Sequence, residues 1–546
     1  MNRPGCYGVS PLMHSFTRSL LALVFLLGLL PGLAPVAQAA DPAADHADTA
    51  PLERGAAIID PFALRALDAT RFGLARMLRP DASVTTPLAS NELFALPSMQ
   101  GVRKALDAEF ERYIAQHKAN LPNESIGVGP GFAFQLFDRA TLDSPDTRFI
   151  LSGIVNRMDR AYVDPTSCGE IRLVYRLTQT KAAEIGEAMV TPRLPMTLNM
   201  VLKAKGDHDV DAKGAPLTCS EIAKRWLATA DLNLTGAELA DKLTEAGGAL
   251  ATVAPDHIVR IETNLQIAHA PKSQARDFRT DYLMKVFDYS AATKAFEEAT
   301  LENQIDRERL LADPDLQREF KAWLLDPLHF GELDRGTILV PEKFLSKAAI
   351  APTPTGFAVS ELQPAFGLVA GEDGTDHPVF SADDVVGALK QAEAKGIAMQ
   401  NIRSAAGLER RLNDITCGGC HQTRGIGGFH FPGVDWMAAK PSNTIVVPAS
   451  PHFFGDQVRR RDILASFAEG KPVDFSRGFA ARPQSRGSTE LAGTEYDDGW
   501  GAHCYVQHDS ASENDASFVG WSCAEGLACQ AMSPASRIGM CFVKTK

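Results

Sequence analysis

The sequence has no excess of positive charge and only one long apolar run. Its 55 Lys and Arg residues are outnumbered by 67 Asp and Glu residues, which gives a formal net charge of −12. This acidic balance argues against a general nucleic-acid-binding protein, and a single apolar run excludes a polytopic membrane protein. The hydrophobic fraction of 45% is ordinary for a soluble protein, and the length suggests roughly two to four domains.

Several catalytic motifs are also missing. The chain lacks G-x-S-x-G, G-x-x-x-x-G-K-[ST] and H-E-x-x-H, the signatures of α/β-hydrolases, P-loop nucleotide hydrolases and zinc proteases. Only one C-x-x-C-H pentapeptide occurs, which argues against a di-haem peroxidase. Cysteine is scarce, with nine residues in all, so the chain as a whole is not a disulfide-stabilised miniprotein.

The N-terminal segment has the pattern of a secretory signal peptide. An apolar run over residues 20–36 follows two arginines and ends at an A-x-A sequence. We therefore expect residues 1–39 to be removed and the mature protein to be periplasmic or secreted by a Gram-negative bacterium, with no membrane span after cleavage. The alternative is an uncleaved anchor, against which two prolines in the run argue. Met1 and Met13 are alternative starts.

Residues 58–380 predict an α+β domain. Apolar and polar residues alternate in several segments, which is typical of strands with one buried and one wet face and favours a mainly antiparallel sheet. These segments are 148–156, 171–177, 196–203, 259–267 and 278–286. Helices are predicted at 101–117, 219–230, 236–252 and 290–324. Residues 346–380 are expected to form a loop, and a helix should follow Ser381.

Residues Cys417, Cys420 and His421 form C-x-x-C-H, the attachment signature of c-type haem. The two thiols reach the two vinyl groups of the porphyrin, and the following imidazole binds the iron. Gly418 and Gly419 leave room for the ring. Together with export, this motif predicts one covalent haem c. The alternatives are a disulfide or redox C-x-x-C pair and a zinc site completed by two histidines.

This motif and its export signal resemble those of c-type cytochromes. The wider pattern resembles a group of large exported proteobacterial proteins with one late C-x-x-C-H motif. The shared segments are IVNRMDR (154–160), CGEIRLVYRL (168–177), RIETNLQIA (260–268), TCGGCHQTR (416–424) and GFHF (428–431). The cytochrome resemblance covers residues 400–475. The resemblance to the wider group implies the architecture of the chain, and it implies no particular activity.

The second axial ligand of the iron stays open. His430 lies between two phenylalanines, as suits an imidazole in an apolar haem pocket. His452 and Met437 are alternatives, and so is an open site. We assign His421 and His430 as the expected iron ligands.

Two groups of charged residues lie near the haem motif or the first strand. Arg424 and residues 459–461 are candidates to pair the haem propionates, but an arginine run is more often a solvated helix start. The segment 157–160, with Glu170 and Arg172, either lines a functional cleft or forms a buried ion-pair network between strands, and we favour the network.

The remaining cysteines predict disulfides in an oxidising compartment. Cys168 and Cys219 are expected to pair. A second group predicts a module with two disulfides, whose connectivity the sequence does not choose: Cys504, Cys523, Cys529 and Cys541. The expected organisation is a linker at 40–57, the α+β domain at 58–380, a helical c-type haem segment at 381–482, a linker at 483–493 and a cysteine-rich module at 494–546.

These observations predict an exported mono-haem cytochrome-like protein that transfers electrons to a redox partner of unknown identity. One alternative is a haem-dependent oxidoreductase, peroxidase- or oxygenase-like, with an open distal site. The large α+β region favours that alternative, because a simple electron carrier needs only about a hundred residues. Another is a binding or sensor protein that haem stabilises.

Overall fold

The structure is a computed structural model, and every residue that it describes belongs to one unit, Ala50–Lys546. The described residues are 54–82, 86–180, 183–185, 188–190, 193–211, 213–270, 279–354, 379–419, 453, 456–478, 503–531 and 537–543.

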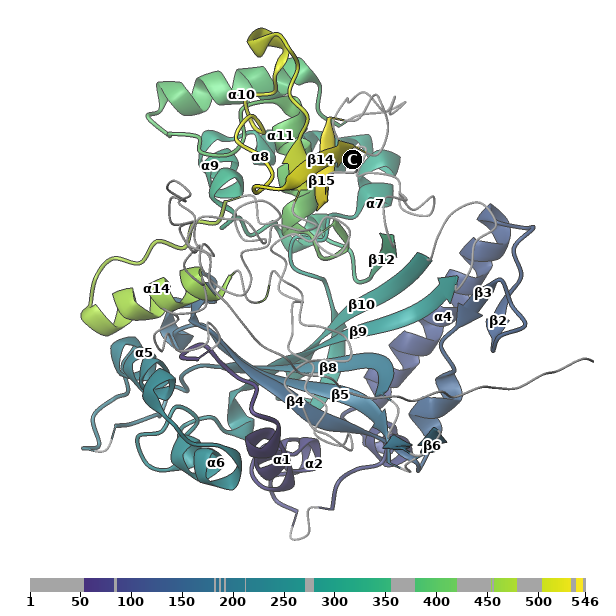
Figure 1. The fold of residues 1–546 in the computed structure, drawn as a ribbon, viewed down its shortest axis with the longest axis vertical. Helices are drawn as coiled ribbons and strands as arrows, with labels where there is room; N and C mark the ends of the chain where they lie inside the picture. Colours follow the sequence, from purple (N-terminus) through teal and green to yellow (C-terminus); the bar gives the residue numbers. More distant parts are fainter. Residues whose placement is uncertain are drawn as a thin grey trace, which may run out of the picture. The chain divides into compact units, whose positions relative to one another are not determined.

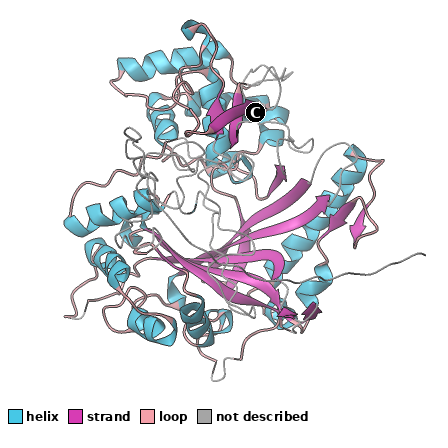
Figure 2. Cartoon of the chain, viewed as in Figure 1, coloured by secondary structure: helices cyan, strands magenta, loops and turns pink. Residues whose placement is uncertain are grey.

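A large sheet organises the first part of the chain (Figures 1 and 2). Its strand order is β1-β4-β5-β8-β9-β10-β11, and all these neighbours are antiparallel. β12 adds to β10, β3 adds to β9, and β2 pairs with β3 in parallel. The strands of this sheet are β1 (Ala57–Ile58), β2 (Ile126–Val128), β3 (Phe134–Leu136), β4 (Thr147–Arg157), β5 (Glu170–Gln179), β8 (Arg193–Lys203), β9 (Ile258–Ala270), β10 (Arg279–Ser290), β11 (Ala295–Ala299) and β12 (Ala349–Pro354). A separate hairpin comprises β6 (Ala183–Ile185) and β7 (Ala188–Val190).

The predicted α+β class and its antiparallel sheet are confirmed, and the five predicted strands correspond to β4, β5, β8, β9 and β10. Two secondary-structure predictions for the segment between β10 and the C-x-x-C-H motif were wrong. The expected helix at 290–324 begins instead with β11, because a turn with Lys294 in the left-handed region returns the chain onto β10. Residues 349–354 of the expected loop form β12, because their backbone pairs with residues 279–284 of β10, on the edge of β10 that is not occupied by β9.

Helices pack against the sheet, and a further group of helices, α7–α11, follows it in the chain (Figure 1). They are α1 (Pro61–Ala69), α2 (Leu74–Leu78), α3 (Ser90–Ala95), α4 (Gln100–Asn120), α5 (Cys219–Leu227), α6 (Gly236–Thr244), α7 (Arg307–Ala312), α8 (Pro314–Leu324), α9 (Pro327–Arg335), α10 (Ala382–Ala394), α11 (Ala405–Ile415) and α14 (Gln457–Glu469). α4 buries Val102, Leu106 and Phe110 at the predicted spacing of four. α6 ends eight residues before the predicted limit of 252.

Two hydrophobic cores divide the helices. The first joins the apolar face of the sheet to α1–α6. The second joins α7–α9 to α10 and α11, so it contains residues on both sides of the boundary expected at 380/381. Asp334 helps to hold these helices together, because its carboxylate accepts hydrogen bonds from the backbone amides of Gln400, Asn401 and Ile402. No described helix has the length and apolar character needed to cross a membrane.

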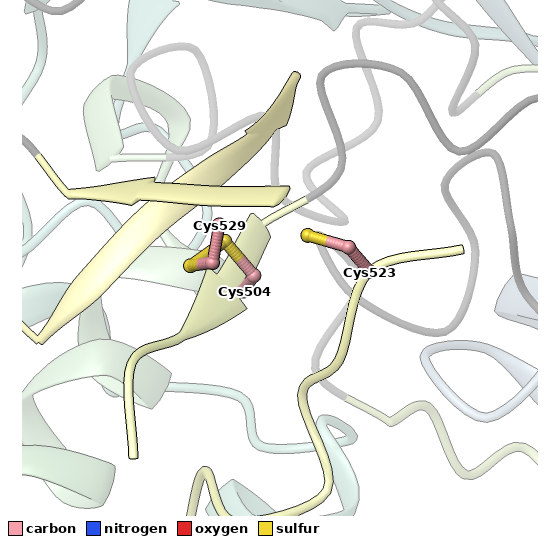
Figure 3. Close-up of side chains that lie close together, drawn as sticks. All are labelled: Cys504, Cys523 and Cys529. Atoms are coloured by element: carbon pink, nitrogen blue, oxygen red, sulfur yellow. A yellow bond between two sulfur atoms is a disulfide. The ribbon is translucent and has the colours of Figure 1, made fainter. Parts of the chain in front are cut away.

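The last described residues form a small disulfide-rich sheet, which agrees with the predicted C-terminal module. Its order is β13 (His503–Tyr505), β15 (Ile538–Val543), β14 (Leu527–Ala531). Disulfides join Cys504 to Cys529 and Cys523 to Cys541, which supplies the connectivity that the sequence left open. Figure 3 shows three of these sulfur atoms gathered together, but disulfide sulfur is not available as a thiolate ligand for a metal.

The other expected bridge, Cys168–Cys219, is also present. It ties the turn before β5 to the first residue of α5, across a separation of 51 residues. Cys168 takes a left-handed conformation in that turn. The bridge therefore fixes α5, and α14 packs beside it, with the Ser220 hydroxyl donating to the carbonyl of Ala468 at 3.0 Å.

Candidate functional site

Helix α11 positions Cys417, the first residue of the C-x-x-C-H motif. The guanidinium of Arg411 is buried and donates to the carbonyls of Leu333 and Asp334, which fixes the helix against α9. Thr416 follows the helix, and residues 417–419 begin a new helical turn. The Thr416 hydroxyl caps this turn by accepting a hydrogen bond from the Gly419 amide at 3.0 Å. The position of Cys417 is thus set by two helical elements and a cap.

The two glycines of the motif have local packing roles. A Cβ on Gly419 would lie 2.2 Å from the carbonyl oxygen of Asn413, so a larger residue would force the turn away from α11. The Gly418 amide donates to the Gln304 side chain at 2.9 Å. Space for a porphyrin was the reason expected from the sequence, and these contacts supply a second reason for Gly419.

The Cys417 thiol is held between an apolar cluster and charged groups. It is the one described cysteine that is not in a disulfide. On one side it packs against five apolar residues of the sheet and its neighbours: Met284, Val286, Leu301, Ala349 and Ala351. Glu262 and Glu302 line the same cavity as the thiol. Burial, followed by these two carboxylates, raises the pKa of the thiol, which keeps it protonated at neutral pH.

Cys417 also lines a cavity of about 350 Å³, which is within the range of small-molecule sites. The wall comes from the ends of β5, β9 and β10, the segment after β11, and α11. Most of its side chains are polar or charged. The charged ones are Arg160, Arg172, Arg260, Glu262, Asp288, Glu302, Glu342, Asp414 and Arg477.

Five charged side chains of this wall and Glu170 form a balanced cluster of three arginines and three glutamates: Arg160, Arg172, Arg260, Glu170, Glu262 and Glu302. Arg172 lies 2.8 Å from Glu170 and 3.2 Å from Glu262. Arg260 pairs with the same two carboxylates at 2.7 and 2.9 Å. The four strand residues among them lie on the polar face of β5 and β9, which we expected to be wet. That expectation was wrong for Glu170, Arg172 and Glu262, which are buried and paired with opposite charges.

A second group, the arginine-rich cluster, lies beside the first. It comprises four arginines and two aspartates: Arg157, Arg459, Arg460, Arg477, Asp159 and Asp456. Asp159 accepts from Arg157, Arg459 and Arg477, each at 2.8 Å. These arginines hold the pKa of Asp159 well below its usual range despite complete burial. Arg477 connects this cluster to the cavity, because it pairs with Asp159 and also lines the cavity.

The structure describes some of the site residues that the sequence suggested. The segment 157–160 with Glu170 and Arg172 forms the buried network that we favoured, and part of that network also lines the cavity. The solvated reading of the arginine run was wrong for Arg459 and Arg460, which are largely buried.

Other expected residues lie outside the described part of the chain: Cys420, His421, Arg424, His430, Met437 and His452.

Sequence reasoning missed several wall residues. Arg260 and Glu262 alternate on β9, and that alternation could have suggested a shared polar face. Glu302 and Arg477 follow irregular segments with no motif of their own. Comparison with known proteins found no match to the chain among family models, curated proteins or solved structures.

Proposed function

We propose that this chain is an exported mono-haem c-type protein that transfers electrons in the periplasm. Cys417 and Cys420 would form the thioether bonds to one haem, and His421 would be the proximal iron ligand. The C-x-x-C-H motif behind a signal-like N-terminus is the sequence basis of this proposal.

The observation that carries the proposal is the state of Cys417. The six other described cysteines are paired in disulfides, whereas this thiol faces a cavity. The cavity wall includes apolar side chains, among them Val286 and Leu345, that could contact a porphyrin edge, and it includes arginines that could pair with carboxylates. These two kinds of side chain suit the amphipathic character of haem.

The environment of Cys417 disfavours one alternative for the motif, a redox-active C-x-x-C pair, because such pairs react as thiolates. Burial, followed by the charges of Glu262 and Glu302, raises the pKa of the Cys417 thiol.

When bound, the haem would supply a one-electron change at iron. The chain's own residues would hold it and control its surroundings. Cys417 would fix one edge over the apolar cluster, and the buried charges would set the local electrostatic potential. The balanced cluster adds no net charge to that potential, since its three arginines face three glutamates.

The cavity supports a second candidate, a haem-dependent oxidoreductase. An electron carrier has no need of a charged cavity of about 350 Å³ beside its attachment site, whereas an enzyme can use one to bind a polar substrate. The two candidates differ in whether the iron keeps an open coordination position.

An absorption spectrum tests both candidates. The protein should be produced with its signal sequence in a host that matures c-type cytochromes. The reduced pyridine adduct should have the bands of a haem joined by two thioethers. A low-spin ferric spectrum that carbon monoxide does not change after reduction supports electron transfer, whereas carbon monoxide binding supports the oxidoreductase. Purified protein without any haem spectrum would contradict the proposed function.

A further inference from the structure

The C-terminal disulfide module has no part in the proposed haem site. Its described residues are 503–531 and 537–543. Its interior is small: one cluster contains Tyr505, Phe518 and Trp521, and another consists largely of the four disulfide cysteines. So short a segment rarely buries enough apolar surface to fold without covalent links. The module therefore depends on its two disulfides for its shape.

One loop of this module contacts the N-terminus of α11. Ser404 is the N-cap of that helix, and its hydroxyl accepts a hydrogen bond from the Gly407 amide at 2.9 Å. The same hydroxyl donates to the Asp515 carboxylate at 2.8 Å and lies 2.9 Å from the Ser517 hydroxyl. The Ser517 hydroxyl also accepts a hydrogen bond from the Arg403 amide at 3.0 Å. The module thus orients the side chain that caps α11, and a cap of this kind stabilises a helix by about 1 kcal/mol.

The module also packs along the side of α11. A Cβ at Gly407 would lie 2.2 Å from the Ser517 hydroxyl oxygen, so any other residue at that position would displace Ser517. Further along the helix, the guanidinium carbon of Arg410 lies 5.5 Å from the centre of the Trp521 ring, which is within the range of cation–π attraction. The contacts therefore continue from the cap into the second turn of the helix.

Arg410 extends these contacts to the cavity. Its Nε donates to the Asp414 carboxylate at 3.1 Å, and Asp414 lines the cavity together with Cys417. The Asp414 side chain is fully buried, so its charge needs a partner. The helix has only 11 residues, and isolated helices shorter than about 12–15 residues are marginal in water. α11 therefore depends on contacts at both ends: Arg411 holds the last turns, and the module holds the first ones.

We propose that the C-terminal module is a disulfide-dependent clamp that holds α11 in place and thereby keeps Asp414 and Cys417 in the cavity wall. Opening a disulfide of the module would release Ser404 and Arg410, and the cavity end of the helix would loosen. The cavity would then reach its final form only in a compartment where the module is oxidised. The clamp does not rest on the proposed function, because none of its contacts involves haem.

The Cys417 thiol reports whether the helix is held. Burial raises the pKa of this thiol, so it is alkylated slowly while it stays in the cavity wall and faster once the helix loosens. The test protein is the full-length chain with Cys420→Ala, exported by a host that lacks c-type maturation, so that no haem blocks the thiol. Iodoacetamide labelling of the peptide that contains Cys417 is followed by mass spectrometry at several urea concentrations below the unfolding transition.

Cys504→Ser/Cys529→Ser opens one disulfide of the module, and Cys168→Ser/Cys219→Ser is its matched control, because that disulfide holds α5 instead. We expect the module variant to be labelled about tenfold faster, as for the loss of one or two hydrogen bonds. This increase should not depend on urea, which is the mark of local opening. The control should be labelled faster only as urea brings it toward global unfolding, although it loses a disulfide as well.

A milder pair of variants covers the case in which the module variant does not fold. Ser517→Ala removes two hydrogen bonds at the N-terminus of α11, whereas Ser512→Ala removes an exposed hydroxyl that, within the described residues, bonds only to Ser510. Ser517→Ala should speed the labelling of Cys417 several-fold without dependence on urea, and Ser512→Ala should leave the rate at that of the parent. The proposal is overturned if Ser517→Ala is labelled at the parent rate, or if a folded module variant shows the same urea-dependent labelling as the control variant.

Discussion

Replacing Asp159 by Asn should be among the most destabilising single changes in the chain. The Asp159 carboxylate is fully buried and accepts from three arginines at 2.8 Å. Asn keeps the shape but removes the negative charge that faces Arg157, Arg459 and Arg477. Breaking a buried ion pair costs about 3–5 kcal/mol, and we expect a loss of that size in the free energy of unfolding.

Urea unfolding followed by circular dichroism measures this loss. The matched control is Asp315→Asn, because that carboxylate also pairs with an arginine, Arg318, but its side chain is 84% exposed. The control should change stability by at most about 1 kcal/mol. A loss below about 1 kcal/mol for Asp159→Asn would refute the idea that this cluster is buried and charged.

The pH dependence follows from the lowered pKa of Asp159. Its ionised form is favoured by folding, so its contribution is present above the unfolded-state pKa, roughly pH 4. The contribution is lost as pH falls through the lower folded-state pKa. The gap in stability between the parent and Asp159→Asn should therefore be constant near neutral pH and shrink in acid.

Three further predictions concern other parts of the chain. Burial raises the pKa of Asp68 to about 6, so ionisation of this carboxyl destabilises the fold as pH rises from roughly 4 to 6. Asp68→Asn should remove this loss of stability, which urea unfolding at pH 8 should measure as roughly 2–3 kcal/mol. A stability difference between the parent and Asp68→Asn that stays the same from pH 4 to pH 8 would contradict it. The Cys168→Ser/Cys219→Ser protein should lose about 4 kcal/mol, because its bridge closes a long loop; an unchanged unfolding midpoint would show that the bridge does not form. His430→Ala should convert a low-spin ferric spectrum to high spin if His430 is the second axial ligand, and an unaltered spectrum would shift the assignment to His452, Met437 or an open site.

The sheet could be predicted because its pattern is local. Alternation along β5, β8 and β9 shows which residues share a face, and antiparallel pairing follows from it. What lies over the polar face is not local. Asp159 meets Arg459 and Arg477 across 300 and 318 residues, and no spacing in the sequence reports such pairs. An arginine run was therefore assigned to solvent, where such runs are usually found.

The same reasoning explains why the surroundings of Cys417 could not be predicted. The C-x-x-C-H signature could be read from five consecutive residues, and the haem that it predicts stays a prediction. Its environment depends on Glu302, Arg477 and β12, none of which carries a recognisable signal. β12 was missed because a proline-containing strand resembles a loop in sequence, and such strands are tolerated at sheet edges.

The central claim is that Cys417 and Cys420 bind one haem covalently, and intact-mass spectrometry tests it most directly. Protein exported by a host with an active c-type maturation system should carry the added mass of one haem after acid–acetone extraction, and the Cys417→Ala/Cys420→Ala protein should not. Peptide mapping should place the addition on the peptide that contains both cysteines. An unmodified parent mass, from cells in which a reference c-type cytochrome is fully loaded, would contradict the claim.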